Sequence, residues 1–84
     1  MMELKDTIEL MESADYKDRF KAEFYQLVIR YKKLNKMYVN WEKLDFTPTC
    51  PKETFLMQLR AMYDYIVVLK ARAEFEHIEL EIDI

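Results

Sequence analysis

The sequence predicts an all-α protein: an antiparallel two-helix hairpin with a short N-terminal helix, oligomerising as a helical bundle. The 84 residues include no glycine and only two prolines, and 51% are hydrophobic, which favours helices joined by few turns. Two segments repeat apolar residues at helical spacing, and both prolines fall between them. A chain of this length has room for one domain, 1–84, and would be only marginally stable as a lone monomer.

The N-terminal residues predict a short helix and no targeting segment. Leu4, Ile8 and Met11 are spaced as on one face of an amphipathic helix, which would end near "ESAD". Nothing there resembles a signal peptide, and the longest apolar stretch, "YIVVL", is too short to span a bilayer. A single cysteine rules out an internal disulfide. We therefore expect a cytoplasmic protein with no membrane partner.

The first arm of the hairpin, expected over about 15–44, carries an apolar stripe. Its members step by four and three residues: Phe20, Phe24, Leu27, Tyr31, Leu34, Tyr38 and Trp41. This is the heptad period of a coiled-coil seam. The seam places its aromatic members in the core and the lysines of "YKKLNK" on outer positions.

The break and the second arm follow directly. Pro48 and Pro51 in "LDFTPTCPKE" disfavour helix just before each of them, so this segment is a connection. The second arm, expected over about 51–78, repeats the heptad spacing with Phe55, Leu59, Met62, Ile66, Leu69 and Ala73. Two seams joined by a short loop predict an antiparallel hairpin. The tail "HIELEIDI" alternates like an edge strand but is also compatible with a frayed acidic helix end, which we favour slightly.

Apolar residues also lie outside both seams. Those expected to form an oligomer interface are Tyr25, Ile29, Tyr63, Val67 and Phe75. A second apolar face of this breadth on a two-helix unit is typical of a partner surface. We therefore expect the chain to bind copies of itself.

Catalysis is not expected. The only histidine, His77, stands among glutamates, and the only cysteine, Cys50, lies in a loop beside a proline. Neither has partners at the spacing that a general base, a nucleophile or a metal ligand needs. The absence of glycine removes the loops that cradle phosphates in nucleotide enzymes. The sequence therefore predicts no enzyme, no metal site and no cofactor.

Charge is distributed unevenly along the chain. The net charge is −3, and acidic residues dominate 3–15 and 74–84, whereas residues 30–43 are basic. If subunits pack around the apolar face, basic groups of several chains would converge on a site for phosphates, with tyrosines stacking on bases. A merely solvated lysine face remains the alternative. The acidic total makes a nucleic-acid binder the weakest candidate.

The two arms resemble a family of small helical-hairpin proteins of phages and prophages, related to a protein of crAss-like phages. The resemblance covers about 15–80, in "DYKDRFKAEFYQLVIRYKKLNKM" and "ETFLMQLRAMYDYIVVLKARAEFEHIEL". Matching positions in the first arm are Arg19, Glu23, Leu27, Arg30, Lys33 and Leu34. In the second arm they are Leu56, Gln58, Leu59, Ala61, Met62, Tyr65, Leu69, Arg72, Ala73 and Glu76. His77 stands where a glycine is usual.

That hairpin is similar to phage sponge proteins that inhibit the CBASS and Thoeris defences. These bind cyclic oligonucleotides or cyclic ADP-ribose derivatives between subunits and do not cleave them. The resemblance thus implies an anti-defence sponge in the cytoplasm of an infected bacterial host, with a cyclic nucleotide signal as partner. Arg30 and Lys33 are candidate ligand residues at matching positions, and Tyr16 and Lys36 are added from their chemistry alone. The alternative is a protein-binding hairpin that inhibits a host or defence protein.

Overall fold

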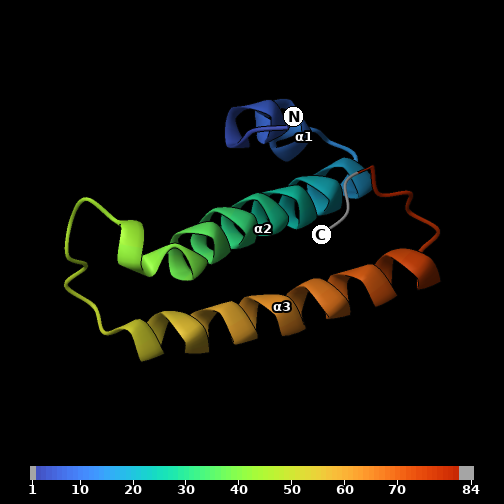
Figure 1. Cartoon of the computed structure of the whole chain (residues 1–84). Helices are drawn as coiled ribbons and strands as arrows, with labels where there is room; N and C mark the ends of the chain where they lie inside the picture. Colours follow the sequence, from blue (N-terminus) through green and yellow to red (C-terminus); the bar gives the residue numbers. More distant parts are fainter. Residues whose placement is uncertain (1, 82–84) are drawn as a thin grey trace.

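The computed structural model describes residues 2–81, and within them the only regular structure is helical. The elements are the 3₁₀ helices η1 (Leu4–Thr7) and η2 (Trp41–Lys43) and the α-helices α1 (Ile8–Glu12), α2 (Tyr16–Val39) and α3 (Lys52–Phe75). The helices α2 and α3 run antiparallel, and α1 lies on the side of α2 turned away from α3 (Figure 1). The molecule measures 42 × 24 × 19 Å, so it is elongated. The all-α prediction is confirmed.

Both arms are shorter at their C-terminal ends than predicted. The first begins as expected, because the Asp15 side chain caps α2 by accepting a hydrogen bond from the Lys17 N–H at 2.9 Å. It ends at Val39, so Trp41 lies in η2 and contacts Phe55 of α3 with their ring centroids 5.9 Å apart. No helix of the described residues is long and apolar enough to cross a membrane.

A left-handed residue ends the second arm. His77 has φ 57°, the Ile78 N–H donates to the Ala73 carbonyl at 2.9 Å, and the His77 N–H donates to the Glu74 carbonyl at 3.3 Å. These two bonds form a Schellman motif, with His77 at the position that glycine usually occupies. The motif ends α3 at Phe75 and turns the chain back over the hairpin.

The tail is neither a strand nor a helix end, so the favoured prediction of a frayed helix is wrong for its described part. Residues 78–81 are irregular, Ile78 is buried in the core, and the Glu81 N–H donates to the Tyr25 hydroxyl at 3.0 Å. The prediction also covered 82–84, which lie outside the described residues. Alternation in this tail therefore reflects packing against α2 rather than pairing with a strand.

The core lies in the half of the hairpin nearest the termini. Its buried apolar members are Phe20, Phe24, Tyr25, Val28, Ile66, Leu69, Ala73 and Ile78. The seam positions nearer the loop, among them Tyr31 and Tyr38, are only half-buried. The packing is densest near the termini because the N-terminal segment and the tail both add to α2 there.

Tyr25 and Ile29 were expected on an outer face, and the structure corrects this. They are only 1% and 7% exposed, because the tail reaches Tyr25 while η1 and α1 pack on α2. The buried Thr7 hydroxyl anchors that packing by accepting a hydrogen bond from Gln26 of α2 at 2.9 Å. The remaining residues of the expected interface, Tyr63, Val67 and Phe75, are exposed on α3.

Candidate functional site

Polar side chains of both arms meet on one side of the hairpin. Gln58, Tyr65 and Arg72 are spaced by seven residues, so they form one line along α3. The Tyr65 hydroxyl donates a hydrogen bond to the Glu23 carboxylate, and the Arg72 guanidinium donates one to the Tyr16 hydroxyl. The two bonds connect this line to the matching side of α2.

The α2 side of the same surface is hollowed next to α1. A groove of about 380 Å³ is lined by Met11, Arg19, Ala22, Glu23, Gln26, Leu27 and Arg30. Lys33 follows Arg30 by three residues and therefore lies beside it on the helix. We call this surface the polar face, and it consists of Tyr16, Arg19, Glu23, Arg30, Lys33, Gln58, Tyr65 and Arg72.

The end of the polar face near the termini is held by Arg72. Its guanidinium lies 4.9 Å from the Phe20 ring centroid, and its Nε lies 3.3 Å from the Glu76 carboxylate. Desolvation lowers the pKa of Arg72, but the attraction of Tyr16 and Glu76 outweighs it, so the pKa is raised above its ordinary value. Arg72 and Tyr16 are thus already committed to contacts within the chain.

The cations at the other end are different. Arg30 and Lys33 are exposed, and within the part of the chain that the structure describes neither has a hydrogen-bond or ion-pair partner. Arg19, by contrast, donates to the Ser13 carbonyl at 2.9 Å. An external anion would therefore bind best at the Arg30–Lys33 end, where the positive charges are not paired with other described residues.

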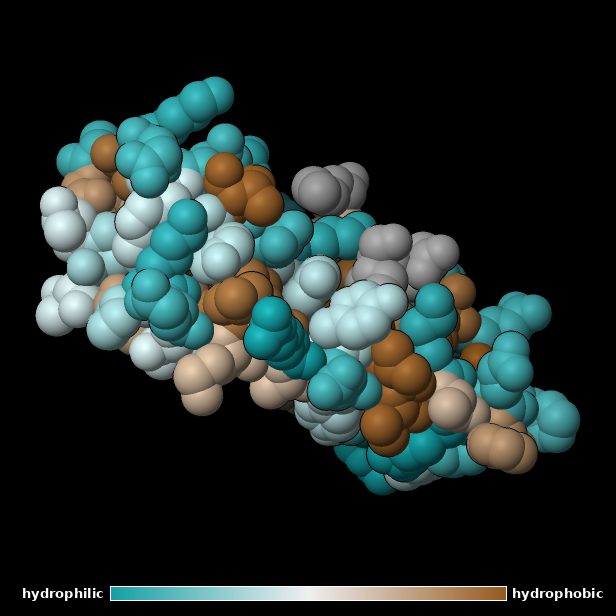
Figure 2. Space-filling view, turned by 60° about the horizontal axis from the view of Figure 1, so that its bottom comes forward, coloured by the Kyte–Doolittle hydropathy of each residue, from teal (hydrophilic) through white to brown (hydrophobic). Residues whose placement is uncertain are grey.

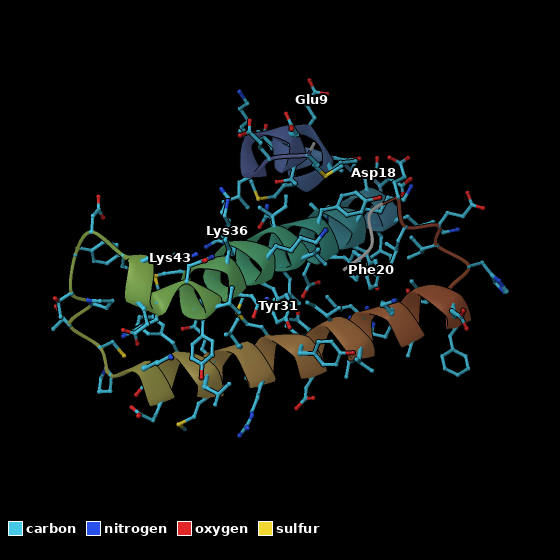
Figure 3. The ribbon with its side chains drawn as sticks, viewed as in Figure 1. Glu9, Asp18, Phe20, Tyr31, Lys36 and Lys43 are labelled. Carbon is cyan, nitrogen blue, oxygen red and sulfur yellow. The ribbon has the colours of Figure 1, made fainter. Side chains whose placement is uncertain are left out.

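The four predicted ligand residues do not form one site within a single chain. Tyr16 precedes Arg30 by 14 positions, which is about 21 Å along a helix. Lys36 points away from α3 (Figure 3), lies six residues from Arg30 and does not line the groove. The structure brings Arg30 and Lys33 together and pairs Tyr16 with Arg72 instead.

Sequence reasoning missed the bonds between the arms and a second groove. The resemblance identifies Tyr65 and Arg72 as matching positions without a role, and only the pairing of the arms reveals their partners. The other groove, about 300 Å³, is lined by Tyr31, Asn35, Tyr38, Val39, Leu56, Leu59, Arg60, Tyr63 and Asp64. The sequence predicts Tyr31 and Tyr38 as seam residues and Tyr63 as an interface residue, and the ring centroids of Tyr31 and Tyr63 lie 6.1 Å apart.

The match to a known family covers the helical hairpin. A family model named Sequestin matches residues 14–75, which include all of α2, the loop and all of α3. The chain belongs to the Sequestin family. That name indicates sequestration, and the Sequestin match spans the arms that build the polar face. No curated protein and no solved structure matches the chain.

Proposed function

We propose that this Sequestin-family chain is a phage-encoded anti-defence sponge. It binds a cyclic oligonucleotide or a cyclic ADP-ribose-type immune signal in the cytoplasm of an infected bacterium and holds it without cleavage. The observation that carries the proposal is a groove of about 380 Å³ lined in part by the exposed Arg30, with the exposed Lys33 three residues further along α2. A groove of this size is in the range of small-ligand sites.

The two cations suit the phosphates of such a signal. An arginine fork binds two phosphate oxygens at once, and a lysine adds a compact charge that adapts to the next phosphate. The groove also contains the apolar surface of Leu27 and Met11, against which a base would pack. Because Tyr16 lies about 21 Å from Arg30 along α2, it would contact a different ligand, or a ligand held with another copy.

Binding is tested by a thermal-shift panel followed by calorimetry. The panel contains cyclic dinucleotides, cyclic trinucleotides and cyclic ADP-ribose isomers, with duplex DNA as the nucleic-acid control. For a ligand that binds, Arg30→Ala or Lys33→Ala should weaken affinity by about 1–3 kcal/mol, the usual contribution of a charge-assisted hydrogen bond. Lys36→Ala is the matched control, because it removes a lysine of the same helix that lies six residues beyond Arg30 and does not line the groove.

Sequestration and catalysis are separated by recovery of the ligand. After incubation and denaturation of the protein, chromatography should return the signal unchanged. Cleaved product would contradict a sponge. Absence of binding across the panel, or an equal loss in Lys36→Ala, would contradict the assignment of the polar face.

A protein-interaction module that inhibits a host or defence protein is the second candidate. The observation in its favour is the apolar outer surface of α3, where Phe75 is 85% exposed. In that case Arg30→Ala and Lys33→Ala would leave phage protection unchanged, whereas charges placed on α3 would abolish it.

A further inference from the structure

The outer side of α3 carries a second heptad seam, opposite the one that packs on α2. Its members step by 4, 3, 4, 3 and 4 residues: Met57, Ala61, Asp64, Val68, Ala71 and Phe75. All six are exposed, with Met57 at 68%, Val68 at 53% and Phe75 at 85%. When the α3 side is turned forward, apolar patches appear between hydrophilic side chains along the molecule (Figure 2). We call this row the outer seam.

The outer seam is self-complementary when read in opposite directions. Met57 and Phe75, Ala61 and Ala71, and Asp64 and Val68 each lie at equal distances on either side of Ile66. In an isologous dimer a residue contacts a second residue of the other copy, and the reverse contact is made at the symmetric position. We propose that a second copy of this chain docks antiparallel on the outer seam, with the two-fold axis level with Ile66.

This register joins complementary side chains along the seam. The two most exposed apolar side chains of the row, Met57 and Phe75, cover each other at both ends. Ala61 meets Ala71, and such small residues let two helices approach closely. From each end towards the centre, the layers are thus a large apolar pair, a small pair and the Asp64–Val68 pair.

The flanking positions agree with the same register. On one side Arg60 lies opposite Glu74 of the second copy, and Val67 lies opposite Val67. Opposite charges at flanking positions set partner choice and orientation in coiled coils. On the other side Gln58 lies opposite Arg72 and Tyr65 opposite Tyr65, so the polar faces of the two copies become adjacent.

Asp64 decides against the parallel alternative. A parallel pairing in register would place the two Asp64 carboxylates in one layer, where like charges repel. The antiparallel pairing moves them into adjacent layers, about 6 Å apart along the helix axes, because each Asp64 meets Val68 of the second copy. Asp64 also lies four residues after Arg60 on the same helix, within reach of its charge. The polar residue within the seam thus selects an orientation.

The dimer is tested by light scattering at micromolar concentrations. The wild-type chain should show about twice its mass of 10.3 kDa. Val68→Glu and Phe75→Glu should each raise the dimer dissociation constant by about tenfold or more: the first puts a second carboxylate in the layer that already holds Asp64, and the second replaces the most exposed apolar side chain of the seam with a charge. Val39→Glu is the matched control: Val39 is 67% exposed but lies on α2, so dimerisation should not change.

The relative orientation of the two chains is tested by cross-linking in a Cys50→Ser background, so that the introduced cysteines are the only thiols. These variants add no charge, so they test the dimer even where a glutamate variant fails to fold. A mixture of Met57→Cys and Phe75→Cys chains should link to each other with a short bis-maleimide, whereas neither should link efficiently to itself. A monomer at every concentration, or equal dissociation by Val39→Glu, would overturn the dimer. Efficient self-linking of Met57→Cys would overturn the antiparallel register. None of these results depends on a nucleotide ligand.

Discussion

Replacing His77 with glycine should stabilise the protein. His77 occupies the left-handed position of the Schellman motif at φ 57°, where an ordinary L-residue is disfavoured by about 1–2 kcal/mol. Glycine removes that penalty but adds about 0.4–1 kcal/mol of unfolded-chain entropy. The difference leaves a net gain of about 0.5–1 kcal/mol in the free energy of unfolding. For a domain of this size that corresponds to a rise in Tm of roughly 2–8 °C.

Three variants separate the backbone effect from the imidazole. His77→Ala removes the exposed imidazole but keeps the backbone penalty, so it should leave the free energy of unfolding nearly unchanged. His77→Val should destabilise, because a β-branched residue is a poor occupant of positive φ. Urea unfolding at fixed protein concentration measures all three, since association would make Tm depend on concentration. A glycine variant no more stable than the alanine variant would refute the reasoning.

Two further predictions concern the packing of the hairpin. Tyr25→Phe should lower the free energy of unfolding by about 1 kcal/mol by removing the acceptor of the Glu81 N–H, whereas Tyr25→Ala should cost about 3–5 kcal/mol; urea unfolding distinguishes them. An insertion of a few flexible residues between Phe46 and Pro51 should cost under about 1 kcal/mol, because loop-closure entropy rises slowly with length. The same insertion after Leu34 should turn Tyr38 away from α3 and unfold the loop half, which circular dichroism melts would show as a lost or broadened transition.

The period of the seams was enough to predict the hairpin but not what covers it. The four-and-three spacing identified both arms because half-buried helices bury one stripe each, and α2 and α3 do so. The same spacing made Tyr25 and Ile29 look like an outer face. Tyr25 and Ile29 are buried by short segments, among them a 3₁₀ turn and an irregular tail. The contacts of such segments follow no hydrophobic period that the sequence would show. The position of the polar face likewise depended on which sides of the two arms meet, which the Tyr65–Glu23 and Arg72–Tyr16 bonds reveal.

The extent of the family match explains why the prediction of Tyr25 and Ile29 as outer-face residues failed. The Sequestin model covers 14–75 and therefore excludes η1, α1 and the tail, whose Ile78 is buried in the core. A hairpin reduced to the matched span would expose Tyr25 and Ile29, as the seams alone suggested. In this chain the added segments close that side of α2, whereas no described segment covers the outer side of α3, where Met57, Val68 and Phe75 remain exposed. The proposed second copy would therefore dock on the outer side of α3, and Arg30 and Lys33, which lie on α2, would stay outside that contact.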